Sequence, residues 1–249
     1  MTASPDSFAF PPRRRSERLG VAVTSELVEL IVTGEIPEGA LLPPEGPLSD
    51  HFGVSRTVIR ESAKRLEEKG LVIVAQGRGT QVARTGSWNM LDPVVLSALI
   101  DNDESLGVLD ELTVVRGSLE SAMAGAVAAR HTKDELARIE HVLDTMRDMG
   151  RESDASRQED VVFHFTIMEI SRNRLAENIA KRLYRRALES DRYQGAGYEG
   201  AFESTIEEHG KVVAAIARGD VEGAERAMRD HIVSSWQRRR LAAPPADRS

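Results

Sequence analysis

The chain has 249 residues, of which 41% are hydrophobic, and a formal net charge of −7. It contains no cysteine, which excludes disulfide bonds and thiolate metal sites and is typical of proteins in the reducing cytoplasm. No apolar stretch of signal-peptide length lies near its first residues, so the sequence predicts a cytoplasmic protein without a membrane partner.

The charge is unevenly distributed along the chain. Residues 1–84 hold 11 Lys and Arg against 11 Asp and Glu, whereas the remaining residues hold 22 against 29. The acidity therefore belongs to the second part of the chain. The net charge neither favours nor excludes a nucleic-acid partner.

Breaks in the hydrophobic periodicity predict two domains. We expect a flexible arm at residues 1–14, a small mixed domain at 15–84, a polar linker at 85–90, an all-helical domain at 91–241 and a tail at 242–249. In the first domain, apolar residues at helical spacing predict a helix over residues 19–33. A short edge strand is expected at residues 40–42, before two prolines.

Residues 48–69, LSDHFGVSRTVIRESAKRLEEK, predict two helices joined by a forced turn. The first helix covers residues 48–52, Gly53 gives the turn its backbone freedom, and Ser55 is placed to cap the second helix. The second helix has an apolar face, made of Val58, Ile59, Ser62, Ala63 and Leu66, and a polar, cationic face, made of Arg56, Thr57, Arg60 and Lys64.

Such a cationic face suits the major groove of DNA, because Arg pairs with guanine and Lys or Thr holds phosphates. An ordinary amphipathic surface helix would show the same pattern. The next residues decide between these interpretations: a β-branched strand at 71–74, a turn at 76–79 and a return strand at 80–83 predict a hairpin. Two helices followed by a hairpin indicate a DNA-binding domain with a wing.

The segment GVSRTVIRESAKRLEEKGLVIVAQGRGTQVA resembles the winged helix-turn-helix of the GntR superfamily of bacterial transcription regulators, and the resemblance covers residues 15–84. It implies that Arg56 and Arg60 contact the operator and that Thr57 and Val58 lie near bases or backbone. It also implies that the wing tip enters the minor groove with Gln76, Gly77 and Arg78. The family usually has Arg after the Glu of its proline–glutamate motif, whereas here Gly46 follows Glu45, so the chain departs from the pattern at one expected DNA contact.

The second domain is predicted to be an antiparallel helical bundle, which makes the whole fold mainly α. Helices are expected at residues 92–100, 105–130, 133–149, 155–171, 176–194, 201–218 and 221–241. Over residues 91–240 this domain resembles FCD, the ligand-binding domain of the FadR subfamily. The resemblance rests on VVRGSLE (114–120), EDVVFHFTIMEISRNRLAENI (159–179) and EEHGKVVAAIARGDVEGAERAMRDHI (207–232).

A possible metal site lies in these segments. Asp160 and His164 are four residues apart, so they share one helix face, and His209 and His231 fall on the last two helices, which can face the same cavity. Three imidazoles and a carboxylate suit zinc, with nickel or manganese as alternatives. Each residue could instead be a polar side chain satisfied by hydrogen bonds. The resemblance to FCD implies that these four residues hold a divalent metal.

Two further residues are candidates for effector binding. Arg116 lies on the apolar side of a long helix, where a carboxylate ligand could meet it, or where it could pair with Glu120 one turn away. The resemblance implies that Arg116 binds the acid group of an effector and that Asn173 lies near the pocket, although Asn173 could also be only a helix C-cap. The segment WNMLDPVVL (88–96) is similar to the sugar-acid branch of these regulators, the galactonate type.

Together these patterns predict a homodimeric transcription regulator that binds double-stranded DNA at a palindromic operator. We expect a repressor of carboxylate or sugar-acid metabolism genes, released by a small carboxylic acid bound in the metal-containing helical domain. A metal-dependent enzyme acting on a small acid is one alternative, but HExxH, phosphate-loop and nucleophile-elbow motifs are absent, so we expect no catalysis. A constitutive architectural DNA-binding protein is the other.

Overall fold

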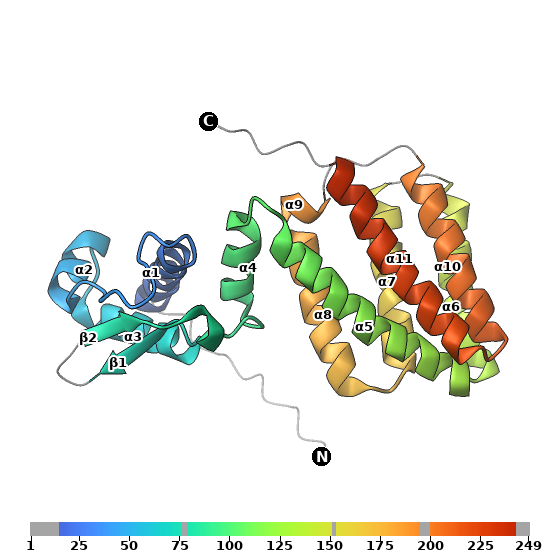
Figure 1. Ribbon diagram of the computed structural model, residues 1–249, viewed down its shortest axis with the longest axis horizontal. Coiled ribbons are helices and arrows are strands. Elements are labelled where there is room, and N and C mark those ends of the chain that lie inside the picture. The colour runs from blue at the N-terminus through green and yellow to red at the C-terminus, as the bar shows by residue number, and fades with distance from the viewer. Residues whose placement is uncertain (1–14, 76–78, 151–152, 195–199, 243–249) are drawn as a thin grey trace, which may run out of the picture. The chain divides into compact units, whose positions relative to one another are not determined.

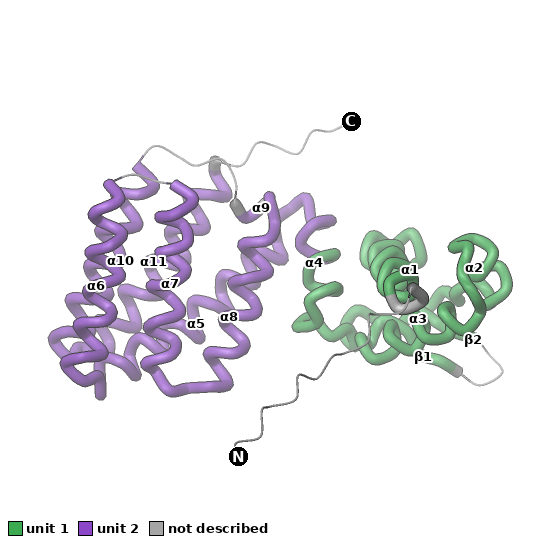
Figure 2. Tube along the Cα trace, turned by 180° about the vertical axis from the view of Figure 1, so that it is seen from behind, with its two compact units in different colours: residues 1–98 green, residues 99–249 purple. Residues whose placement is uncertain are grey.

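The computed structural model describes residues 15–75, 79–150, 153–194 and 200–242. The chain forms two compact units, residues 1–98 and 99–249, which Figure 2 shows in separate colours. Each unit has a core of its own. Within the described ranges, no helix is both long enough and apolar enough to cross a lipid bilayer.

The first unit has three helices followed by an antiparallel hairpin: α1 (Arg15–Val32), α2 (Glu45–Phe52), α3 (Arg56–Glu68), β1 (Val72–Ala75) and β2 (Gly79–Val82) (Figure 1). Residues 40–42 pair with β2, because the Leu42 amide donates to the Thr80 carbonyl at 2.8 Å and the Val82 amide donates to the Ala40 carbonyl at 2.9 Å. The predicted edge strand and hairpin are therefore confirmed.

The turn between α2 and α3 has the predicted chemistry. Gly53 has a φ of 62°, in the left-handed region, and the Ser55 hydroxyl accepts a hydrogen bond from the Val58 amide at 3.4 Å. One boundary was wrong: α2 begins at Glu45, three residues before the predicted start. Pro47 is tolerated in the first turn, because its missing N–H has no partner inside the helix there.

The apolar side of α3 forms part of the core of this unit. Val58, Ile59 and Leu66 are buried, as predicted, and α3 packs against α1, whose Leu27 and Val28 are also buried. This packing leaves the opposite side of α3 exposed to solvent, which is the side that carries the cationic residues.

Between hairpin and bundle lie a 3₁₀ turn at Thr85–Ser87 and α4 (Pro93–Asn102). Lys69 and Asp92 form an ion pair at 2.6 Å, which ties the start of this connection to the end of α3. The division between the two compact units falls inside α4, after Ala98. The assignment of residues 85–90 as the domain linker remains a prediction.

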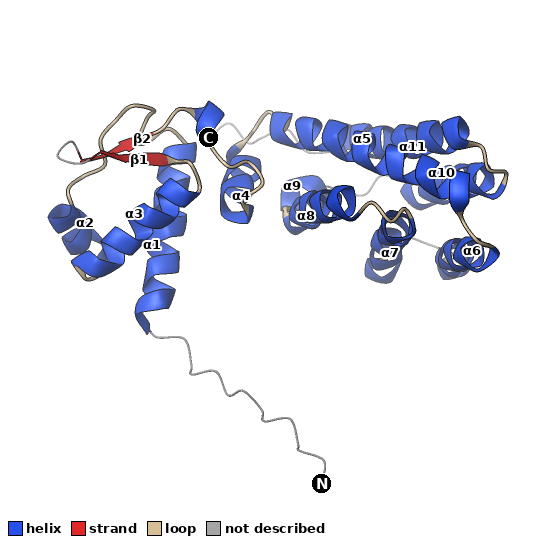
Figure 3. Cartoon of the chain, turned by 90° about the horizontal axis from the view of Figure 1, so that it is seen from below, coloured by secondary structure: helices blue, strands red, loops and turns tan. Residues whose placement is uncertain are grey.

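The second unit is a bundle of α5 (Gly107–Arg130), α6 (Lys133–Met149), α7 (Asp154–Ile170), α8 (Arg174–Glu189), α9 (Asp191–Gln194), α10 (Ala201–Ala217) and α11 (Val221–Ala242). Figure 3 shows α5, α11 and α10 in one layer and α8, α7 and α6 in a second layer. Their shared core includes Phe163, Ile167, Val212 and Met228. The mainly α fold predicted from the sequence is confirmed.

One predicted helix is divided in two. The sequence predicted a continuous helix over residues 176–194, whereas the structure ends α8 at Glu189 and starts α9 at Asp191. Ser190 between them is extended, with φ −90° and ψ 126°. Serine and aspartate compete with helix hydrogen bonds through their own side chains, which favours a break at this point.

Candidate functional site

The first candidate site is the exposed face of α3. Arg56, Thr57, Arg60 and Lys64 are exposed together on this helix, as the sequence predicted. The side chain of Val58 is only 8% exposed and belongs to the core, as its place on the apolar face predicted. Its expected position near bases or backbone of the DNA remains a prediction.

Arg60 is engaged by a carboxylate from the neighbouring helix. Its Nε donates to both carboxylate oxygens of Glu45, at 2.7 and 2.9 Å, while the side chains remain 68% and 42% exposed. This hydrogen bond raises the pKa of Arg60 and lowers the pKa of Glu45. Because water and salt screen exposed ion pairs strongly, the guanidinium can exchange this partner for a nucleic acid.

The departure from the family motif lies beside Arg56. A Cβ added at Gly46 would be 3.6 Å from a guanidinium nitrogen of Arg56, an ordinary contact distance. Gly46 thus leaves space next to a predicted DNA contact where the family usually has an arginine. The wing residues Gln76, Gly77 and Arg78 lie outside the described residues, and their role remains a prediction.

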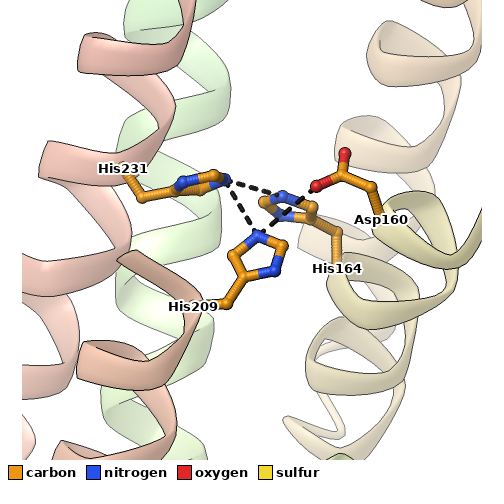
Figure 4. Close-up of side chains that lie close together, drawn as sticks. All are labelled: Asp160, His164, His209 and His231. Carbon is orange, nitrogen blue, oxygen red and sulfur yellow. Dashed lines mark hydrogen bonds and ion pairs between the residues drawn. The ribbon is translucent and has the colours of Figure 1, made fainter. Parts of the chain in front are cut away.

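The second candidate site is a cluster inside the helical bundle. Asp160 and His164 on α7, His209 on α10 and His231 on α11 each offer one ligand atom, and these atoms lie within 4.8 Å of one another. Figure 4 shows the side chains pointing toward a common centre. The His231 Nε2 lies 3.2 Å from the His164 Nε2 and 3.1 Å from the His209 Nε2. The structure therefore brings together the four residues singled out in the sequence.

Three further side chains orient these ligands. The Nδ1 of His164 lies 2.7 Å from a carboxylate oxygen of Glu120, and the Nδ1 of His231 lies 2.9 Å from a carboxylate oxygen of Glu208. The Tyr184 hydroxyl donates to Asp160 at 2.6 Å. Sequence reasoning assigned no role at the cluster to these three residues. No short-range signal marks them, since each partner comes from a different helix than its ligand.

For three of the four ligands, the surroundings shift the pKa toward the protonation state that binds a metal. Burial, followed by interaction with His231, lowers the pKa of His209 well below its usual value. Burial also lowers the pKa of His231, against the opposite effect of Glu208. For Asp160 burial acts to raise the pKa, but interactions with His164 and His209 outweigh it and the pKa is lowered. Neutral imidazoles and an ionised carboxylate are the forms that bind metal ions.

The donor set fits a divalent cation. Since a glutamate accepts the Nδ1 hydrogens of His164 and His231, their Nε2 lone pairs face each other, which is unfavourable without a cation between them. The Nδ1 of His209 is buried and has no hydrogen-bond partner among the described residues. Ligand atoms about 2.0–2.1 Å from a tetrahedral zinc ion are about 3.3 Å apart. The Nε2 separations of 3.1 and 3.2 Å are close to this value.

Arg116 lies next to the cluster and is only 3% exposed. Its Nε donates to Glu120 at 2.8 Å, a second guanidinium nitrogen donates to the Tyr193 hydroxyl at 3.0 Å, and the guanidinium carbon lies 3.5 Å from the centre of the Tyr184 ring. The internal ion pair named as an alternative from the sequence is thus present. Effector binding by Arg116 remains a prediction.

Asn173 is exposed and caps the N-terminus of α8, where its side-chain oxygen accepts a hydrogen bond from the Ala176 amide at 3.2 Å. The alternative of a C-cap was therefore wrong. The cap is the role of this side chain in the structure, and a role for Asn173 in effector binding remains a prediction.

Known proteins match both parts of the chain. The family described as bacterial regulatory proteins, gntR family, matches residues 19–82, and the FCD domain matches residues 111–234. The galactonate operon transcriptional repressor of Escherichia coli (strain K12) is 31% identical over 210 residues, which cover 84% of this chain and 91% of that protein. The HTH-type transcriptional regulator LutR of Bacillus subtilis (strain 168) is 27% identical over 82% of this chain and 94% of LutR.

Solved structures share the fold. The structure of Lar, which controls the expression of the Listeria monocytogenes agr system, superposes with a TM-score of 0.55 at 16% identity, covering 92% of this chain and 97% of Lar. At this level of identity the likeness concerns the fold alone.

Proposed function

Because this chain belongs to the gntR family of bacterial regulatory proteins, with an FCD domain after the helix-turn-helix, we propose that it is a repressor released from its operator by a small carboxylic acid. The chain is a transcription regulator, since the family and the similar proteins are regulators and not enzymes. The proposal includes four further statements: that the chain represses transcription, that it binds an effector, that it binds a metal and that it forms a dimer.

The observation that carries the effector site is the buried cluster of three Nε2 atoms and one carboxylate oxygen within 4.8 Å of one another. Asp160, His164, His209 and His231 would hold a divalent metal, with zinc as the ion that this donor set suits best. A bound metal supplies a Lewis acid to which carboxylate and hydroxyl oxygens bind. Arg116, a cation beside the cluster, gives the effector a second anchor for its negative charge.

A hydroxylated acid fits this site better than a simple fatty acid. The carboxylate and hydroxyl oxygens of a hydroxy acid can bind a metal ion and an arginine together, whereas a fatty acid offers only its carboxylate to the two. One similar protein is named for the galactonate operon, which agrees with a sugar acid as the effector class.

The operator is read by α3. In a two-fold dimer, the two copies of α3 meet two related half-sites, so the operator has a palindromic form. Arg56 and Arg60 supply base and phosphate contacts, with Thr57 and Lys64 beside them. The effector and the operator prefer different states of the protein, so each must weaken the binding of the other by the same factor.

The test combines DNA selection with effector titration. The full-length chain would be used to select operator fragments from genomic DNA, and the metal-loaded protein on that DNA would be titrated with C3–C6 hydroxy acids, including galactonate, gluconate and lactate. Release by at least one acid, lost after chelation and restored by zinc, would support the proposal. If every acid left both the complex and the melting temperature unchanged, a constitutive DNA-binding protein would be the better account.

A further inference from the structure

Each of the two orienting glutamates is itself held by an arginine. Arg116 binds Glu120, which binds His164. In the same way, the two guanidinium nitrogens of Arg238 donate to the two carboxylate oxygens of Glu208 at 2.7 and 2.8 Å, and Glu208 binds the Nδ1 of His231 at 2.9 Å. Two Arg–Glu–His relays therefore meet at the cluster.

The two relays differ in burial. The side chains of Arg116 and Glu120 are 3% and 1% exposed, whereas those of Arg238 and Glu208 are 27% and 18% exposed. Removal of Arg116 would leave a carboxylate charge buried without its partner, which disturbs the core. The outer relay reaches solvent, so its arginine can be replaced while water solvates the glutamate that remains.

We propose that Glu208 and Arg238 are positioning residues for the metal ligand His231, a role that rests on the proposed metal centre. An imidazole offers the Nε2 lone pair to a metal only when its hydrogen is on Nδ1. Glu208 accepts that hydrogen and so fixes both the tautomer and the ring orientation. Arg238 holds Glu208 by two parallel hydrogen bonds, which leaves the carboxylate a single orientation from which it reaches His231.

The position of Arg238 on α11 makes this role separable from folding. Arg238 lies two helical turns after His231, and the same part of α11 is anchored independently. Trp236 is buried, donates from its indole nitrogen to Asp110 at 2.6 Å and stacks on Tyr193 with ring centres 5.5 Å apart. These contacts keep α11 in place when the guanidinium of Arg238 is removed.

The test measures metal affinity in variants with matched controls. The variants are Glu208→Ala, Arg238→Ala and Arg238→Lys. The controls are Glu207→Ala and Lys211→Ala, because Glu207 is the sequence neighbour of Glu208 and forms an exposed ion pair with Lys211 at 2.7 Å. Co²⁺ binding to the full-length chain would be measured by competition with a chromophoric chelator. The melting temperature of the metal-free protein would report on folding.

We expect Glu208→Ala to weaken Co²⁺ binding on the order of 10–100-fold, as loss of a partner that orients a metal ligand does. Arg238→Ala should weaken it by a smaller factor, and Arg238→Lys should recover part of the loss. The controls should bind as the parent does. Co²⁺ affinities within twofold of the parent in both Glu208→Ala and Arg238→Ala would overturn the relay. The relay would also be overturned if the variants with weaker Co²⁺ binding had a lower melting temperature without metal, because the loss would then come from a destabilised fold.

Nitrogen-15 NMR of the imidazoles in the metal-free protein separates the relay from the metal centre. The relay requires His231 to carry its hydrogen on Nδ1 in the parent and to become a mixture of tautomers in Glu208→Ala. A parent that bound no Co²⁺ but showed this change would overturn the proposed metal centre and keep the relay. A His231 hydrogen on Nε2 in the parent would overturn the relay itself.

Discussion

The Nε2 atoms of His164 and His231 face each other at 3.2 Å, while the opposite nitrogen of each ring is held by a different glutamate. Two imidazoles fixed in this way present two lone pairs to the same point. A hydrogen bond between them requires one ring either to take up a second proton or to give up its glutamate, whereas a metal ion satisfies both neutral rings at once. The hydrogen bonds to the glutamates therefore direct both Nε2 atoms toward the proposed metal position.

Loss of two ligands should abolish metal binding. We expect the double variant His164→Ala, His209→Ala to take up no zinc, whereas the parent binds it stoichiometrically in inductively coupled plasma measurements. In the parent, zinc at about a hundredfold its Kd should stabilise the fold by about 2.7 kcal/mol, and chelation should remove this increment. His141→Ala on the exposed side of α6 is the control. Unaltered metal content in the double variant would discard the site.

The cationic face of α3 should carry operator affinity. Arg56→Ala and Arg60→Ala are each expected to weaken binding of the selected operator by about 1–3 kcal/mol, since each removes a base or phosphate contact. Fluorescence anisotropy at fixed salt measures this loss. Arg138→Ala, which removes an exposed arginine from α6 in the other unit, should leave the affinity unchanged. Equal affinity of the parent and both α3 variants would remove this helix from the interface.

Tyr193 should compete with the effector for Arg116. Its hydroxyl occupies a guanidinium nitrogen that a carboxylate would use, so Tyr193→Phe should strengthen binding of the active hydroxy acid by about 0.5–1.5 kcal/mol in calorimetry. Arg116→Ala is the weaker test, because it also leaves Glu120 charged and buried. A lower affinity of Tyr193→Phe for the hydroxy acid would contradict this prediction, because it would mean that the Tyr193 hydroxyl binds the effector and does not compete with it for Arg116.

The buried histidines should make the metal-free protein sensitive to acid. The folded-state pKa values of His209 and His231 are lowered, so below about pH 6.5, the usual histidine pKa, the unfolded chain binds protons that the folded chain does not. The free energy of unfolding must then fall as pH falls, by up to about 1.4 kcal/mol per pH unit for each such proton. Urea unfolding from pH 8 to 5.5 should show a shallower fall in His209→Gln than in the parent. The exposed His51→Gln is the control, and parallel pH profiles in all three proteins would contradict this account.

Two glycines of the first unit should respond differently to alanine. Gly70 has a φ of +73° and a Cβ there would lie 2.1 Å from the Ser87 carbonyl oxygen, whereas Gly53 has a φ of +62° and open space within 4 Å. Gly53→Ala should cost about 1–2 kcal/mol for the left-handed backbone alone. Gly70→Ala should cost more, because the backbone of residues 87 and 88 must also move. Equal midpoints in urea would contradict the predicted difference.

Much of the fold could be predicted because helix periodicity and end signals are local. The bounds of α6 agree with the prediction at both ends, where Thr132 and Glu135 form a capping box and Gly150 ends the helix with a φ of 66°. The start of α2 and the break at Ser190 were missed. At α2, a proline in the first turn disguises the start of the helix, and at Ser190 a single serine interrupts an amphipathic pattern that otherwise continues.

In the candidate site, too, the relationships between residues close in sequence could be predicted and those between distant residues could not. The ligands Asp160 and His164 share one helix turn, so their proximity follows from spacing, and the family resemblance pointed to His209 and His231. Glu208 could not be found from the sequence as a partner of His231, because the two residues are 23 positions apart on different helices. Such pairs depend on how α10 packs against α11, which no local pattern specifies.

The order of the ligands along the chain has a consequence for synthesis. Ribosomes deliver the residues of α3 early and His231 late, after α11 has been largely translated, and N-terminal domains generally fold first. A product that ended before α11 would carry the residues proposed to contact the operator but would lack His231 of the cluster. If the proposed function holds, such a fragment would bind DNA without responding to the effector, so rapid degradation of incomplete chains would protect regulation.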